Sequence, residues 1–174
     1  MALGNNNRQS RTYLTISNGK VVEGTGTNKK YFSFIEGMIE GIYTRKSNFN
    51  GEEVTRWYID ITDEGENYTL CLPYNSGIFK SIILSIASDE HFNPLTRVKI
   101  APYLGNNGYT KVSVYSNGNK LSWITSEIPP QDVIQVGERQ IKDDSKQMEL
   151  IVSLCSAIEG RISNKRTISD LFPA

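Results

Sequence analysis

The stretch FIEGMIEGIY, residues 34–43, decides the fold that the sequence predicts. It lies in a long extended segment that begins at Tyr31, and two glycines, Gly37 and Gly41, interrupt its apolar side chains. Glycine inside a strand marks a bend, a bulge or the close approach of another backbone. Two glycines in one long strand therefore indicate a strand that curls strongly, as the strands of small barrels do.

A hairpin pattern follows this strand. We expect residues 45–56 to form a polar loop, because they are rich in Arg, Asn and Glu. Residues 57–62 then alternate between apolar and polar side chains, and after the turn DEGEN the alternation resumes at residues 68–72. Trp57 and Trp123 both align with aliphatic side chains, so we expect both to anchor the core.

The period of the pattern changes after the hairpin. Residues 78–86 carry the apolar stripe of a short amphipathic helix that Ser76 can open. Two strands near residues 97–101 and 109–115 follow, joined by the turn GNNG, and a last short strand is expected around Leu121, Trp123 and Ile124. A second helix is expected after Asp144, with Gly160 as its C-cap.

This order of elements predicts a mainly β protein. Its centre would be a five-stranded Greek-key barrel, the OB-fold, with a short helix between strands three and four and a C-terminal helix behind it. A β-sandwich stays open, although sandwiches seldom place a helix there. The expected organisation is an arm and short strand in 1–30, the barrel in 31–126, an extension with the helix in 127–162, and a tail in 163–174.

The charge of the chain is balanced overall but not locally. The sequence has 19 Lys and Arg against 19 Asp and Glu, which is typical of a protein with no polyanion partner. Residues 91–126, however, contain four basic side chains and no acidic one. Because nucleic-acid binding depends on the local potential, this stretch is a candidate for contact with phosphates.

Tyrosines lie among these cations. Tyr109 and Tyr115 share a strand face with Lys111, opposite Val112 and Val114. A single tyrosine is explained by its preference for half-exposed strands. Several that alternate with bases on adjacent strands favour the binding of single strands, whose unpaired bases stack on rings while Lys and Arg neutralise phosphates.

Enzyme chemistry has little support in the sequence. His91 is the one histidine and falls in a polar linker, and no metal-ligand spacing, P-loop or nucleophile elbow is present. We therefore expect no catalytic residue, no metal and no cofactor. Cys71 and Cys155 are interpreted as buried thiols. No apolar run is long enough to cross a membrane, and we expect no secretory signal.

The chain resembles a family of tailed-phage single-stranded DNA-binding proteins from about Tyr31 to Ile162. The likeness depends on the order and spacing of four segments, in which LPYNSG (72–77) is the most telling piece. These segments are FIEGMIEGIYTRKS (34–47), WYIDITDEGENYTLCLPYNSGIFKSI (57–82), VSVYSNGNKLSW (112–123) and DDSKQMEL (143–150).

The resemblance implies an OB-fold protein that coats single-stranded DNA, without sequence specificity and without cofactors, in phage replication or recombination in the cytoplasm of the bacterial host. It also implies replication proteins as partners, bound through a C-terminal tail. Here residues 164–174 hold one acid and two bases, unlike the acidic tails of many such proteins. DLFP (170–173) is the expected docking motif.

The residues that we expect to contact DNA fall into two groups. Phe49 stays open between stacking on a base and packing on the barrel. The expected phosphate contacts are Arg45, Lys46, Arg56, Arg97, Lys99 and Lys111, and the expected stacking surfaces are Phe49, Tyr58, Tyr74, Tyr103, Tyr109 and Tyr115.

Two other functions stay open at this point. One is a non-enzymatic β-rich virion, assembly or protein-interaction component, which the zero net charge favours. The other is an RNA-binding OB module, since stacking on aromatic rings does not read the 2′-hydroxyl. Oligomeric state and site size are not encoded in any pattern that we find.

Overall fold

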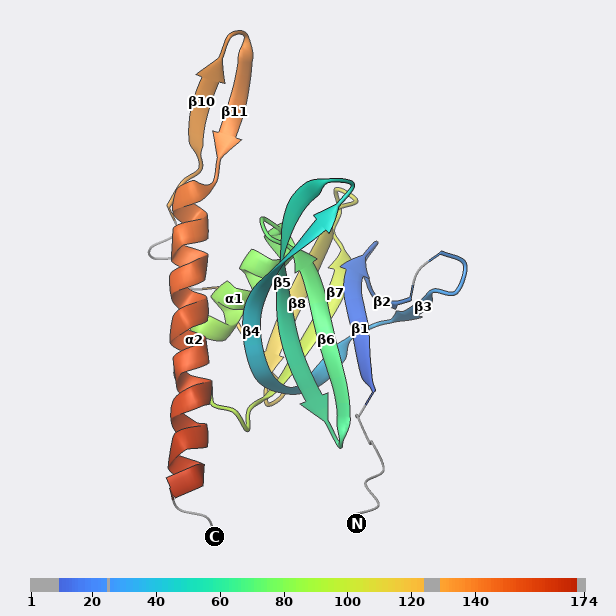
Figure 1. Cartoon of the computed structure of the whole chain (residues 1–174), viewed down its shortest axis with the longest axis vertical. Coiled ribbons are helices and arrows are strands. Elements are labelled where there is room, and N and C mark those ends of the chain that lie inside the picture. The colour runs from blue at the N-terminus through green and yellow to red at the C-terminus, as the bar shows by residue number, and fades with distance from the viewer. Residues whose placement is uncertain (1–9, 25, 124–128, 172–174) are drawn as a thin grey trace.

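The computed structural model describes residues 10–24, 26–123 and 129–171, with side chains up to Ser163. The predicted mainly β class is confirmed, since the described residues form a nine-stranded mixed sheet, a separate two-stranded hairpin and two helices (Figure 1). The elements are β1 (Arg11–Ser17), β2 (Lys20–Glu23), β3 (Lys30–Phe32), β4 (Ile35–Phe49), β5 (Glu52–Asp63), β6 (Glu66–Pro73), α1 (Gly77–Ala87), β7 (Arg97–Leu104), β8 (Thr110–Ser116), β9 (Asn119–Lys120), β10 (Asp132–Val136), β11 (Arg139–Asp143) and α2 (Ser145–Leu171).

The large sheet has the strand order β3-β2-β1-β6-β5-β4-β7-β8-β9. Its neighbours are antiparallel except β1 and β6, which run parallel, with Arg11 opposite Asn67 and Leu14 opposite Leu70. β4 serves two partners in succession, β7 over Ile35–Met38 and β5 from Met38 to Phe49. The curl of β4 thus carries the chain from one half of the sheet to the other (Figure 1).

A β-bulge in β4 confirms that this strand is irregular at its glycines. The register with β5 shifts between Ile39 and Gly41. Before the bulge Ile35 and Ile39 are buried, whereas after it the buried residue is Ile42. The extra residue reverses the alternation, so side chains after the bulge point to the opposite side from the one that simple counting gives.

The core lies between the inner face of the sheet and α1. Trp57 stacks on Phe79 of α1 with ring centres 4.5 Å apart, which confirms Trp57 as a core anchor. Ser76 caps α1, because its hydroxyl oxygen accepts a hydrogen bond from Phe79 N at 3.3 Å. The helix predicted between two hairpins is therefore present, and its stripe of isoleucines is buried.

α2 packs along α1 and the edge of β4. Its buried side chains are Met148, Ile151, Cys155, Ile158 and Ile162, which recur on one side of the helix. Lys80 of α1 pairs with Asp144 just before α2, with Nζ and Oδ2 2.9 Å apart. The helix extends to Leu171, past Gly160 and past residue 163, where we expected a tail. No helix in the described part of the chain has the length and apolar character to span a membrane.

Three local expectations were wrong, one of them the last short strand around Leu121 and Trp123, because β9 is Asn119–Lys120. Residues 45–56 are not a polar loop but the paired ends of β4 and β5, which meet at a tight turn with positive φ at Asn50 and Gly51. Trp123 is 49% exposed and anchors no core. The hairpin of β10 and β11 was not predicted at all. Residues 1–9 of the expected arm, together with Ile124 and with Phe172 and Pro173 of the expected docking motif, lie outside the described residues.

Candidate nucleic-acid interface

The outer side of β7, β8 and β9 carries rings and cations in register. Val98, Ile100 and Val114 are buried beneath it, so the alternate residues of the same strands face away from the core. Across the strands Lys99 lies opposite Tyr115, and Tyr115 lies opposite Lys120 on its other side.

A second cross-strand pair, Tyr103 opposite Lys111, completes this surface. We call Lys99, Tyr103, Lys111, Tyr115 and Lys120 the β7–β8 face. No Asp or Glu occurs between residues 97 and 120, so no carboxylate of these strands competes with a phosphate for the lysines.

Lys99 shows how a cation and rings combine on this face. Its Nζ lies 4.4 Å from the ring centre of Phe34 and 5.4 Å from that of Tyr115. Both distances are within the range of a cation–π interaction, which holds the ammonium over the rings without neutralising its charge. Phe34 was missed in the sequence because it reads as part of an apolar strand.

A groove of about 650 Å³ runs beside β8. Tyr103, Lys111 and Lys120 line it together with Trp123 and the start of α1. Trp123 and Lys120 were not expected at the site, although the absence of acidic residues around both was a signal that pointed there. The groove thus offers two rings and two ammonium groups to one ligand.

Two tyrosines and two arginines form a similar surface on β4 and β5. Tyr43 and Tyr58 stack with ring centres 5.6 Å apart, and Arg45 Cζ lies 5.1 Å and 5.9 Å from the two rings. Arg56 lies opposite Arg45 in the register. We call these four residues the β4–β5 face. Tyr43 was missed because the bulge turns it outward.

Both phenols of the β4–β5 face stay neutral. Burial and the neighbouring carboxylate of Asp60, whose Oδ1 accepts a hydrogen bond from Tyr43 Oη at 3.1 Å, raise the pKa of Tyr43. Burial and then Cys71 raise the pKa of Tyr58. Asp60 itself pairs with Arg11 at 3.3 Å, so its charge is balanced. The rings therefore carry no negative charge that would repel a phosphate.

Two of the predicted phosphate contacts are already paired with carboxylates. Arg97 binds Asp63 at 2.9 Å and Glu36 at 3.1 Å, and these carboxylates raise its pKa. Lys46 lies 3.2 Å from Glu53. We remove Arg97 from the site, since two acids balance its one charge; the exposed pair of Lys46 is weaker and separable.

The remaining predicted rings lie apart from one another. Tyr74 stacks on Trp57 with ring centres 5.7 Å apart, so one side of its ring faces the core. Phe49 is 68% exposed at the tip of the β4–β5 hairpin, which favours stacking over packing. Tyr109, 72% exposed, lies in the turn before β8.

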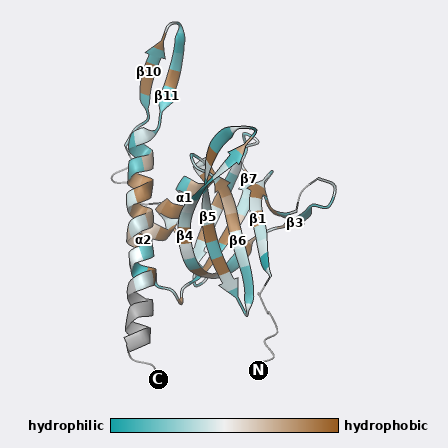
Figure 2. Ribbon diagram, in the orientation of Figure 1, coloured by the Kyte–Doolittle hydropathy of each residue, from teal (hydrophilic) through white to brown (hydrophobic). Residues whose placement is uncertain are grey.

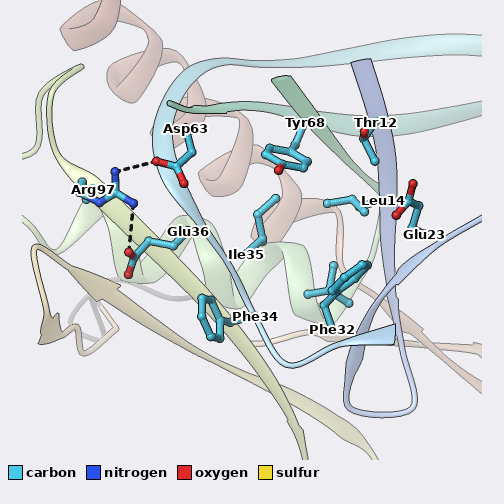
Figure 3. Close-up of a pocket in the computed structure, with 11 residues that line it drawn as sticks. Thr12, Leu14, Glu23, Phe32, Phe34, Ile35, Glu36, Asp63, Tyr68 and Arg97 are labelled. Atoms are coloured by element: carbon cyan, nitrogen blue, oxygen red, sulfur yellow. Dashed lines mark hydrogen bonds and ion pairs between the residues drawn. The ribbon is translucent and has the colours of Figure 1, made fainter. Parts of the chain in front are cut away.

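Arg97 instead borders a cavity of about 370 Å³ between β1 and β4, shown in Figure 3. Its walls include the rings of Phe32, Phe34 and Tyr68, and the carboxylates of Glu23, Glu36 and Asp63. Three carboxylates against one guanidinium make this cavity unsuitable for a phosphate.

Metal chemistry finds no support in the described ranges 10–24, 26–123 and 129–171, where no three His, Cys, Asp or Glu side chains are grouped to hold an ion. His91 is exposed there, Cys155 is buried and Cys71 is only half-buried.

No protein-family model matches this chain, and neither does any curated protein or solved structure.

Proposed function

We propose that this chain binds single-stranded DNA without sequence preference, on an OB-type barrel built from β4 to β8 and α1. The pairings β4–β5, β5–β6, β4–β7 and β7–β8, with the helix between β6 and β7, support that topology. The hairpin of β1 and β2 would close the remaining side, since Gly19 N donates a hydrogen bond to Thr110 Oγ1 at 3.1 Å.

The observation that carries the proposal is the cross-strand alternation of rings and lysines on the β7–β8 face, whose own strands contain no acid. An unpaired base exposes both sides of its ring, and stacking on an aromatic side chain contributes about 1–3 kcal/mol per base. The lysines beside the rings replace counterions along the backbone. A duplex hides its base planes, so this surface favours single strands.

The role that we propose is the coating of single-stranded DNA in phage replication or recombination in the bacterial cytoplasm. Its support is the resemblance of the segments in 34–150 to phage proteins of that kind and the lack of any base-reading row of amides on the face. Binding through stacking and phosphate contact alone is tolerant of sequence.

A fluorescence titration with oligo-dT at several salt concentrations tests the proposal. Quenching of tyrosine and tryptophan emission is expected, with an affinity that falls steeply as salt rises, because binding releases counterions. Duplex DNA of the same length should quench the protein emission only weakly at each salt concentration. Absence of quenching by oligo-dT at low salt would contradict the function.

Two substitutions separate the two kinds of contact. Lys111→Ala is expected to lower the salt slope by about one unit, whereas Tyr103→Ala is expected to weaken binding by about 1–3 kcal/mol with the slope unchanged. Lys146→Ala, which removes the same charge at the start of α2, is the control and should leave both quantities unaltered. Equal slopes for Lys111→Ala and Tyr103→Ala would contradict the assigned roles.

One observation favours a protein-interaction or assembly role as the second candidate. The hairpin of β10 and β11 exposes branched apolar side chains, as an interaction surface would, and Figure 2 shows hydrophobic residues along both of its strands. A protein that assembles through this hairpin and does not bind oligo-dT would fit that role.

Competition between oligo-dT and oligo-U in the same titration distinguishes DNA from RNA as the ligand.

A further inference from the structure

The hairpin of β10 and β11 projects from the N-terminal end of α2, away from the large sheet (Figure 1). Val133 is 59% exposed and Val136 57%, and Ile134 and Ile141 are about half exposed. A two-stranded hairpin on its own is at best marginally stable in water. These side chains therefore gain most if another surface covers them.

The contacts that the structure shows between this hairpin and the rest of the chain lie at its base. Asp132 pairs with Lys146 at 3.2 Å, and Pro129 O accepts a hydrogen bond from Gln147 Nε2 at 3.0 Å. The hairpin is thus anchored to α2 at one end, and its outer strand edges are unpaired among the described residues.

The register determines which backbone groups are available on the edge of β11. Val136 lies opposite Arg139 across a two-residue turn, and Ile134 lies opposite Ile141. In such a hairpin the pair next to the turn exchanges both hydrogen bonds, and hydrogen-bonded pairs alternate with non-hydrogen-bonded ones. Gln140 and Lys142 therefore direct their backbone N–H and C=O groups toward the free edge.

We propose that this hairpin is a dimerisation arm, in which β11 pairs antiparallel with β11 of a second copy about a two-fold axis at Ile141. This register places Gln140 opposite Lys142 of the second copy as a hydrogen-bonded pair and Ile141 opposite Ile141 as a non-hydrogen-bonded pair. Side chains of non-hydrogen-bonded pairs approach more closely, which suits the two isoleucines.

Charge complementarity selects this edge and this register. β11 reads Arg139-Gln140-Ile141-Lys142-Asp143, so reversal about its centre brings Arg139 opposite Asp143 of the second copy, twice. Both side chains lie on the same side as Ile141. Asp143 accepts hydrogen bonds from Ser145 at Oδ1, which leaves Oδ2 for Arg139.

The edge of β10 is less suited to pairing with itself. A two-fold axis at Ile134 would place Asp132 opposite Val136 of the second copy, a carboxylate against an apolar side chain. Pairing through β11 instead gives a four-stranded sheet with Ile134 and Ile141 of both copies in one row. Isologous pairing of this kind closes at two copies and leaves the DNA-contacting faces untouched.

Sedimentation velocity in the absence of DNA tests the arm. The full chain is expected to shift from 19.6 kDa toward twice that mass as its concentration rises, over about 5–200 µM, since a contact this small is weak. Ile141→Glu should abolish the shift, because it places two carboxylates against each other on the axis. Gln135→Glu, which adds the same charge on β10 away from the pairing edge, is the control and should retain it.

A disulfide provides a second measurement that does not depend on affinity. In a Cys71→Ser background, Ile141→Cys is expected to form a covalent dimer under mild oxidation, because only the residue on the axis meets its own copy. Val133→Cys, on the outer strand, should not. A monomer at every concentration, or a dimer that survives Ile141→Glu, would overturn the arm. Because no DNA is present, neither result bears on single-strand binding.

Discussion

Gly37 of β4 lies in close contact with the last residues of β5. A Cβ atom at this position would be 2.5 Å from Thr62 O and 2.7 Å from Ile61 Cγ2. No side chain fits there without moving backbone, so the curl of β4 requires glycine at this residue. Because of the bulge next to Gly41, the side chains of Tyr43 and Arg45 lie on the outer side, on the β4–β5 face.

Gly37→Ala is expected to lower the free energy of unfolding by about 1–3 kcal/mol, the usual cost of inserting an atom into a packed site. Urea denaturation followed by circular dichroism measures it. Gly160→Ala is the matched control: a Cβ there meets no atom within 4 Å, and alanine favours a helix more than glycine does. Gly160→Ala should therefore be neutral or stabilising; equal losses for the two variants would refute the steric argument.

Cys155 is a second residue whose surroundings make a testable difference. Burial, and to a lesser degree Glu159, raises the pKa of its thiol to about 12. The raised pKa favours the folded state fully below the pKa of the unfolded thiol, near 9, and this contribution is lost as the pH rises toward 12. At pH 8 Cys155 should resist a disulfide reagent that reaches Cys71 first.

Measuring how many protein thiols react with the reagent at pH 8, in native and in denatured protein, checks this expectation. The native Cys71→Ser variant should react no faster than global unfolding allows, whereas the denatured variant should react at once. Rapid reaction of the native variant would mean that Cys155 is accessible.

At the scale of elements, α2 supplies a hydrogen-bond acceptor to the backbone of β4 beside its bulge. After Met38, β4 is no longer paired with β7, and Glu159 of α2 accepts a hydrogen bond from Ile42 N. Arg161, two residues further along α2, donates a hydrogen bond to Asp89 O at 2.8 Å, beyond the end of α1. The C-terminal helix is therefore part of the support of the large sheet and not an appendage.

Glu159→Ala is expected to lower the free energy of unfolding by about 1–3 kcal/mol, because it leaves a half-buried N–H of β4 without its acceptor. Glu149→Ala, an exposed acid of the same helix, should change stability by less than about 0.5 kcal/mol. Thermal and urea unfolding of both variants measure the difference. If Glu149→Ala were as costly as Glu159→Ala, net charge and not the hydrogen bond would be responsible.

Elements with a clear period were predictable, and those set by tertiary pairing were not. The stripe of 78–86 and the alternation of 57–72 reveal a helix and a hairpin directly. In 45–56 the polar composition hid two strands, because cross-strand pairing there is independent of burial. Lys99, Tyr103, Lys111 and Tyr115 were placed on one face correctly by alternation, but Tyr43 needed the bulge.

At the scale of the whole molecule, the two ring-and-cation surfaces belong to different halves of the sheet, joined only by β4. The strands of the β7–β8 face carry no acid, and Glu36, which lies opposite Lys99 on β4, is paired with Arg97; on the β4–β5 face, in contrast, Asp60 belongs to β5 itself. A short oligonucleotide is expected to occupy the first face alone. A longer one can reach both.

Arg56→Ala should therefore weaken binding of dT oligomers of about 16 nucleotides while leaving those of about 5 unchanged, within the range of site sizes known for single barrels. Lys99→Ala should weaken both lengths. Fluorescence titrations at one low salt concentration compare the four combinations. A loss for the shorter oligomer with Arg56→Ala would place its site on the β4–β5 face instead.

The parallel pairing of β1 with β6 has a consequence for the synthesis of the protein. During translation Leu14 leaves the ribosome before β6 exists, and its partner Leu70 is made only after the two long strands β4 and β5 have been completed. Pairing between distant segments is slow, so the nascent chain must carry β1 without its β6 neighbour at least until β6 has been synthesised. A chaperone that shields that strand would raise the yield of folded protein more than one acting on the completed chain.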